Sequence, residues 1–206
     1  MNREKKSEII RQSILTAATS LFEQNGFEKT KVNDIAAKAE LSKATFYAYF
    51  ESKEVLLDTL LLNQLRDIIS RIRELIARKM GKENCFIAVC NMFVEVSKKN
   101  PVCYNRMLQY FGVPYNDKTP QLYKDILKEA QNLSDTLYQA MSENHLTKLF
   151  TAKTPQQAVF YLWISVTGII SIIQKKEALL LALYGVTEEE FLSFSFKQLY
   201  LSASDD

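Results

Sequence analysis

Apolar residues recur every three or four positions along most of this chain, and this periodicity constrains the fold more than any other feature. Between Leu57 and Leu75 the apolar positions follow one face of a helix, with charged side chains on the other faces. Only five glycines and four prolines interrupt the 206 residues. The pattern predicts an all-α protein with about nine helices, in which the helix from residue 53 to about 79 is about 40 Å long.

Between residues 30 and 53, a hydroxyl-bearing residue is followed directly by a lysine three times. The pairs are Thr30-Lys31, Ser42-Lys43 and Ser52-Lys53. Ser and Thr are favoured N-caps, so each pair is expected to open a helix. A lysine in the first turn opposes the helix dipole unless an anion such as phosphate lies in front of it. The pairs therefore predict contacts with a nucleic-acid backbone, and the alternative is that these lysines are ordinary solvated residues.

The spacing inside the same stretch indicates two short helices joined by a tight turn. Ile35, Ala36 and Ala39 form the apolar face of the first helix. Leu41 is the apolar residue of the turn, and Ser42 caps the second helix. Two short helices in this arrangement form a helix-turn-helix, whose second helix enters the major groove of DNA.

The segment from Ile14 to Leu57 resembles the N-terminal signature of the TetR family of bacterial transcription regulators. The matching positions are Ala17, Ala18, Leu21, Phe22, Gly26, Phe27, Thr30, Ile35, Ala36, Ser42, Lys43, Thr45, Tyr47, Phe50, Ser52, Lys53 and Glu54. The chain departs from the family pattern at Lys31, where a second Ser or Thr is usual, and at Glu40, where glycine is common. If the turn requires a left-handed conformation, Glu40 adopts it at a cost of about 1 kcal/mol.

The resemblance implies a helix-turn-helix DNA-binding domain at residues 1–52 and a larger helical ligand-binding and dimerisation domain at residues 53–206. Lys43, Ala44 and Thr45 would face base edges from the start of a recognition helix that Ser42 caps. The residues expected to contact phosphates are Thr30, Lys31, Tyr47, Tyr49 and Lys53. The implied partners are a palindromic double-stranded DNA operator, a small-molecule inducer and a second copy of the chain.

Two stripes near the C-terminal end are candidates for the dimer interface. One consists of small residues at successive i+3 positions and the other of apolar residues on the last helix: Ser165, Gly168 and Ser171, and Leu192, Phe196 and Leu199. The resemblance implies a four-helix bundle formed by this pair of helices from each chain. The alternative is that both stripes belong to the internal core.

Aromatic and apolar residues of the central helices are candidates for a ligand site. They are Phe86, Cys90, Phe93, Tyr104, Met107, Phe111, Tyr123, Trp163 and Thr167. The resemblance implies an inducer pocket among these helices, and its composition suggests a bulky, largely apolar ligand. The alternative for any one of these side chains is a place in the core.

Several other classes of protein find no support in the sequence. No GxSxG motif, glycine-rich phosphate loop or metal-ligand cluster is present, so we expect no enzyme activity, cofactor or metal. The N-terminus lacks the apolar region of a signal peptide, which predicts a cytoplasmic location. The apolar run from Ala158 to Ile173 is too short to span a bilayer and predicts a buried helix. Cys85, Cys90 and Cys103 are expected to be buried apolar side chains.

We therefore predict a ligand-responsive DNA-binding transcription regulator, a repressor that a bulky, largely apolar molecule releases from its operator. The formal net charge is only +2, so DNA affinity must come from the placement of charges and from dimer symmetry. The alternative is a helical ligand-binding or protein-interaction module that has lost DNA binding. Binding to a duplex that weakens steeply with salt would distinguish the two.

Overall fold

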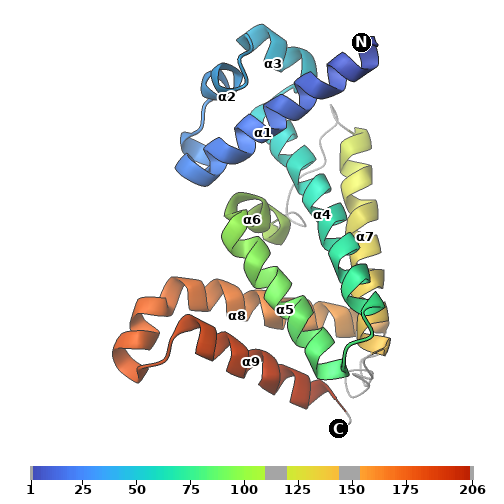
Figure 1. Ribbon diagram of the computed structural model, residues 1–206, viewed down its shortest axis with the longest axis vertical. Helices are drawn as coiled ribbons and strands as arrows, with labels where there is room; N and C mark the ends of the chain where they lie inside the picture. Colours follow the sequence, from blue (N-terminus) through green and yellow to red (C-terminus); the bar gives the residue numbers. More distant parts are fainter. Residues whose placement is uncertain (1, 110–119, 144–153, 205–206) are drawn as a thin grey trace. The chain divides into compact units, whose positions relative to one another are not determined.

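The computed structural model describes residues 2–109, 120–143 and 154–204, which form nine helices and no strand (Figure 1). The helices are α1 (Arg3–Lys29), α2 (Val32–Lys38), α3 (Lys43–Tyr49), α4 (Lys53–Ala77), α5 (Lys82–Lys99), α6 (Pro101–Gln109), α7 (Pro120–Glu143), α8 (Pro155–Tyr184) and α9 (Glu188–Ala203). The predicted all-α fold is confirmed.

The chain divides into two compact units, and the divisions fall within helices. The first unit comprises Met1–Leu65 and Lys98–Glu129, and the second comprises Arg66–Ser97 and Ala130–Asp206. Helices α4, α5 and α7 therefore each contribute residues to both units. The first unit is larger than the predicted DNA-binding domain at residues 1–52, because α6 and the start of α4 share its core.

The core of the first unit lies beneath the helix-turn-helix. Ile14, Ile35 and Phe46 have no measurable exposure, and Phe50 is 2 % exposed. The other buried members of this core are Leu15, Ala17, Ala18, Phe22, Ala36, Leu56, Leu57 and Cys103. The apolar face predicted from Ile35 and Ala36 is therefore buried, and together with Phe46 it determines which side of α2 and α3 is left to solvent.

The turn between α2 and α3 is a Schellman motif with a glutamate at its left-handed position. The Leu41 amide donates to the carbonyl of Ala36 at 2.9 Å, and the Glu40 amide donates to that of Ala37 at 3.0 Å. Glu40 has a φ of 58°, so the left-handed conformation expected of this position is present without glycine. Leu41 packs against the core and anchors the turn.

Local sequence signals define most of the other helix ends. Proline occupies the first position of α6, α7 and α8, where the missing N–H costs no hydrogen bond. A capping box of Thr187 and Glu190 begins α9, with reciprocal hydrogen bonds of 3.2 and 2.9 Å. The Thr187 amide and hydroxyl each donate to the Glu190 carboxylate at 2.9 Å, and these two bonds hold the pKa of Glu190 below its ordinary value. The left-handed residue beyond α4 is Lys79, with a φ of 49°.

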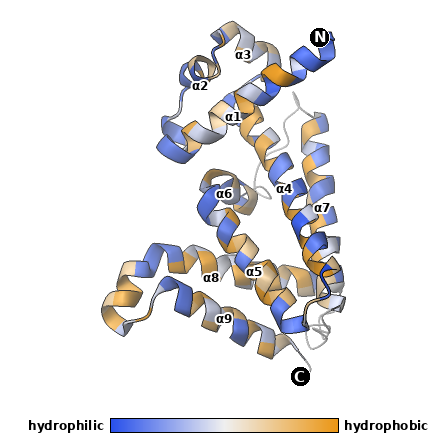
Figure 2. Ribbon diagram, in the orientation of Figure 1, coloured by the Kyte–Doolittle hydropathy of each residue, from blue (hydrophilic) through white to orange (hydrophobic). Residues whose placement is uncertain are grey.

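Helices α8 and α9 pack against each other in the second unit. Ile170 of α8 and Phe196 of α9 are completely buried, whereas Phe160, Ile164 and Ile172 of α8 are each more than half exposed. Figure 2 shows the apolar character of α8. The prediction that α8 is a buried helix is therefore wrong for one of its faces.

Among the described helices, only α8 is long and apolar enough to cross a bilayer, through Gln156–Tyr184. This span is longer than the apolar run recognised in the sequence. Core helices of proteins that never enter a membrane meet the same criterion, so the result does not point to a membrane by itself.

Candidate functional site

Helix α3 separates a buried aromatic side from an exposed polar side. Phe46 is fully buried and Phe50, the residue after the helix, lies 6.0 Å from it between ring centroids. Lys43, Ala44 and Tyr47 are exposed. Because the aromatic anchors hold the helix from below, its first turn and outer face are presented to solvent, as a groove-reading helix requires.

Ser42 caps α3 as predicted. Its hydroxyl accepts the amide of Thr45 at 3.0 Å, and the two hydroxyl groups are 2.8 Å apart. The Thr45 side chain is half-buried, and its hydrogen bond with the Ser42 hydroxyl holds it at the cap. The Lys43 ammonium lies 6.0 Å from the Tyr47 ring centroid, which places a cation and an aromatic ring together on the exposed face.

The first hydroxyl-lysine pair does not open a helix in the predicted way. Thr30 is the C-cap of α1, is only 2 % exposed, and donates its hydroxyl to the carbonyl of Gly26 at 2.8 Å. The exposed Lys31 is the N-cap residue of α2, and its amide donates to the Asp34 carboxylate at 3.3 Å. The hydroxyl of Thr30 points back to α1 because the kink at Gly26 leaves carbonyls there to be satisfied.

The other two predicted phosphate contacts lie in different environments. Tyr49 is half-buried and packs against the core of the first unit. Ser52 caps α4 by accepting the Val55 amide at 3.2 Å, and Lys53, the first residue of α4, is half-buried beside the end of α1.

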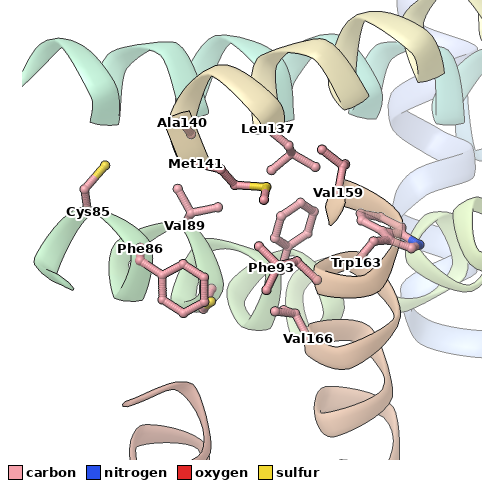
Figure 3. Close-up of a pocket in the computed structure, with 12 residues that line it drawn as sticks. Cys85, Phe86, Val89, Phe93, Leu137, Ala140, Met141, Val159, Trp163 and Val166 are labelled. Carbon is pink, nitrogen blue, oxygen red and sulfur yellow. The ribbon is translucent and has the colours of Figure 1, made fainter. Parts of the chain in front are cut away.

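The second unit contains an apolar cavity of about 50 Å³ between α5, α7 and α8 (Figure 3). Its walls are Cys85, Phe86, Val89, Cys90, Phe93, Leu137, Ala140, Met141, Val159, Leu162, Trp163 and Val166. No charged side chain is among them. Figure 3 shows the sulfur end of Met141 directed toward Leu137 and Phe93. Phe93 and Trp163 meet edge to face, with ring centroids 5.4 Å apart.

The cavity brings together four of the predicted ligand residues, namely Phe86, Cys90, Phe93 and Trp163. Three others, Tyr104, Met107 and Tyr123, belong to the first unit and do not line it. Thr167 does not line it either, and its hydroxyl donates to the Trp163 carbonyl at 2.6 Å. Phe111 lies outside the described residues.

Eight lining residues were not predicted, although helical spacing could have found several of them. Val159, Leu162 and Val166 flank Trp163 at the i, i+3, i+4 and i+7 positions of one α8 face. Leu137, Ala140 and Met141 have the same relation on α7. The spacing defines each face, but it does not say which faces meet.

All three cysteines are buried, as predicted. Burial raises the pKa of the Cys103 thiol to about 12 and raises that of the Cys90 thiol further. Near neutral pH these thiols are protonated and therefore behave as small apolar groups.

The predicted dimer stripes have opposite environments. Leu192, Phe196 and Leu199 are buried within the protomer, so the α9 stripe is internal core and its assignment to an interface is corrected. Ser165, Gly168 and Ser171 are only partly buried, and no atom lies within 4 Å of where a Cβ on Gly168 would be. Large exposed apolar side chains flank this α8 stripe, namely Tyr161, Ile164 and Ile172. Helix α9 exposes two more, Phe194 and Leu201.

Residues 14–60 match the family described as bacterial regulatory proteins, tetR family. The chain is 27% identical over 113 residues to the HTH-type transcriptional regulator YuxN of Bacillus subtilis, covering 55% of this chain and 39% of YuxN. It is 36% identical over 67 residues to the HTH-type transcriptional repressor KstR2 of Rhodococcus jostii, covering 32% of this chain and 33% of KstR2. The match thus spans only a third to two fifths of these curated relatives.

Similarity of fold extends over nearly the whole chain. The crystal structure of the transcriptional regulator FadR from Bacillus subtilis in complex with stearoyl-CoA superposes with a TM-score of 0.60 at 17% identity, covering 93% of this chain and 98% of FadR. At this identity the likeness concerns the fold alone.

Proposed function

We propose that this chain, which belongs to the TetR family of bacterial helix-turn-helix transcription regulators, represses transcription by binding an operator. A largely apolar small molecule releases it from that operator. The observation that carries this proposal is the form of α3, in which Phe46 is buried while Lys43 and Ala44 face solvent. A helix held in this way can enter a major groove without losing its anchor. Such a regulator acts in the cytoplasm.

The proposed DNA contacts form two groups, base contacts and phosphate contacts, which differ in side-chain exposure and chemistry. Lys43, Ala44 and Thr45 read base edges from the first turn of α3, where Ser42 supports them. Lys31 and Tyr47 are exposed and contact the backbone phosphates. The half-buried Tyr49 reaches the phosphates only with its hydroxyl end. Phosphate contacts position the protein, and base contacts give it sequence preference.

The exposed face of α8 is the proposed dimer interface. Tyr161, Ser165, Gly168 and Ile172 follow i+4, i+3 and i+4 spacing, so they line one side of the helix. Small residues flanked by large apolar ones allow a second helix to approach closely and to bury the flanking side chains. Association through this face would remove an exposed apolar patch from water and would supply the second recognition helix.

The proposed inducer binds in the apolar cavity of the second unit. At about 50 Å³ the cavity is a third of the roughly 150 Å³ cavity that accepts benzene in an engineered protein, so a bulky ligand must widen it. Met141 is the wall residue best able to move, because its side chain is long and unbranched. The walls suit an acyl chain or another uncharged apolar group, such as the acyl part of the stearoyl-CoA that FadR binds.

Helix α4 transmits the effect of ligand binding from the second unit to the first. The helix is continuous from Lys53 in the first unit to Ala77 in the second, a length of about 37 Å at 1.5 Å per residue. A ligand that widens the second unit would tilt α4 and alter the separation of two recognition helices. A coupling free energy of about 1–3 kcal/mol gives a 5- to 150-fold change in operator affinity.

Selection of bound fragments from a random duplex library tests the DNA-binding function. We expect a palindromic consensus, because two-fold symmetry of the protein imposes symmetry on its site. The logarithm of affinity should fall linearly with that of salt concentration, with a slope of about −0.9 for each phosphate neutralised. Failure to enrich any duplex would instead support the alternative, a helical ligand-binding or protein-interaction module without DNA binding.

Trp163, the only tryptophan in the chain, offers a direct test of the cavity. We expect its fluorescence to change on titration with decanol or a long-chain fatty acid and to remain constant with citrate. Ala140→Phe should fill the cavity and weaken decanol binding at least about tenfold, while operator affinity is kept. The control is Ser142→Phe, at an exposed position of the same helix. Equal loss in both variants, or a response to citrate alone, would contradict the assignment.

A further inference from the structure

The C-terminal end of α1 is irregular and leaves backbone carbonyls without helical donors. Gly26, with a φ of 75°, interrupts the helix, and Thr30 follows as an extended C-cap. Side chains satisfy the exposed oxygens. The Thr30 hydroxyl lies 2.8 Å from the carbonyl oxygen of Gly26 and 3.3 Å from that of Leu21, and it donates to them.

Lys53 donates to two more carbonyls at the same end of α1, and that of Phe27 also accepts the Thr30 amide at 3.3 Å. Its ammonium donates to the carbonyl oxygen of Phe27 at 2.7 Å and to that of Thr30 at 3.1 Å. The same Nζ lies 4.0 Å from the centroid of the Phe27 ring. A cation at a helix C-terminus is favoured by the helix dipole, and the ring face adds a second attraction. The charge of Lys53 is therefore directed into the protein.

These contacts join residues that are 23 to 26 positions apart in sequence. Ser52 caps α4 at the same point by accepting the Val55 amide at 3.2 Å. The first turn of α4 is thus held by its own cap and, through the Lys53 side chain, by the end of α1. Reaching a phosphate with this ammonium would leave the carbonyls of Phe27 and Thr30 without their charged donor.

We propose that Lys53 is a positioning residue that clamps α4 to the end of α1 and is not a phosphate ligand. The proposal rests on the proposed DNA-binding function, because the clamp holds the frame that carries α2 and α3. The resemblance assigned Lys53 the same phosphate-binding role as Lys31. The structure distinguishes the two, since Lys31 is exposed whereas the ammonium of Lys53 donates to two backbone carbonyls.

Lys53→Met tests the clamp, because methionine keeps an unbranched apolar stem and removes the ammonium. The matched control is Lys31→Met, which makes the same change at the exposed N-cap position of α2, where the proposed function places a phosphate contact. For each full-length variant, the thermal unfolding midpoint and the salt dependence of binding to the selected duplex would be measured. Lys53→Arg is the conservative variant, since a guanidinium retains several N–H donors.

We expect Lys53→Met to lower the unfolding midpoint by at least about 2–4 °C, the scale for a chain of this size. It should weaken duplex binding by a similar factor at every salt concentration and leave the salt slope unchanged. Lys31→Met should leave the midpoint unchanged and reduce the magnitude of the salt slope by about 0.9 per phosphate lost. Lys53→Arg should restore most of the midpoint.

A Lys53→Met variant with an unchanged midpoint and a reduced salt slope would overturn the proposal, because that is the behaviour of a phosphate ligand. The unfolding measurement needs no DNA. If the unaltered protein bound no duplex, the proposed function would fail, but a lowered midpoint in Lys53→Met and its recovery in Lys53→Arg would still support the clamp. If Lys53→Met did not fold, recovery of the fold in Lys53→Arg would support it equally.

Discussion

Phe46→Ala is expected to lower the free energy of unfolding of the first unit by about 3–5 kcal/mol and to abolish operator binding. Phe46 is completely buried, and its ring lies 5.4 Å from that of Tyr47 and 6.0 Å from that of Phe50 between centroids. Truncation would remove the main anchor of α3 and leave a cavity beneath it. The loss is a large part of the 5–15 kcal/mol that stabilises a typical domain. Urea denaturation followed by circular dichroism measures it.

Tyr47→Ala is the matched control for Phe46→Ala, because it removes a neighbouring ring of similar size from the same helix. Tyr47 is 47 % exposed, so its loss should change stability by no more than about 0.5 kcal/mol. Its effect should appear in DNA affinity instead. Equal destabilisation by the two substitutions would show that α3 is not anchored in the way the structure indicates.

Ile164→Asp is expected to dissociate the proposed dimer and to lower operator affinity by at least about 100-fold. Ile164 is 54 % exposed in the protomer and lies on the apolar face of α8. Burying a carboxylate without a partner at an interface costs about 3–5 kcal/mol, and each 1.4 kcal/mol is tenfold in affinity. Sedimentation equilibrium gives the association state, and binding to the selected operator gives the consequence.

Leu127→Asp on α7 is the control for Ile164→Asp, because it places the same charge at an apolar residue that is 40 % exposed. It should leave the association state unchanged. A dimer that persists in Ile164→Asp would exclude this face as the interface. An unaltered protein that sediments as a monomer would exclude the dimer itself.

The helices themselves were predictable because their signals are local. Residues within four positions of one another define a helix face, a proline start or a capping box, as with Thr187 and Glu190. Ser42 was recognised as the cap of α3 for the same reason, since its partner Thr45 is three residues away. The left-handed conformation of Glu40 was suggested only by the resemblance, because glycine is common at this position in the family.

The side-chain directions in the hydroxyl-lysine pairs could not be predicted from neighbouring residues. The hydroxyl groups of these three similar dipeptides have two outcomes. Ser42 and Ser52 cap helices, but Thr30 turns its hydroxyl back to α1. The direction of a side chain depends on which acceptors the fold brings near it, and for Lys53 the acceptors are distant in sequence.

The candidate sites of the second unit depended on tertiary packing in the same way. The sequence identified Trp163 and Phe93 as candidates, but not Met141 on α7 as the residue opposite them. It also offered the α9 stripe of Leu192 and Phe196 as an interface, because an apolar stripe has the same spacing whether it contacts its own chain or a second one. Only the structure showed that this stripe is buried within the protomer.

The sequence by itself determined the all-α fold, the helix-turn-helix and the resemblance of residues 14–60 to the tetR family, because these follow from short-range spacing and from residue types at neighbouring positions. Tertiary structure alone decided which helix faces enclose the cavity, which apolar face stays exposed on α8, and that Lys53 points inward. The physical reason is that burial and hydrogen-bond partners are set by contacts between distant segments, and helical periodicity carries no information about which segments meet.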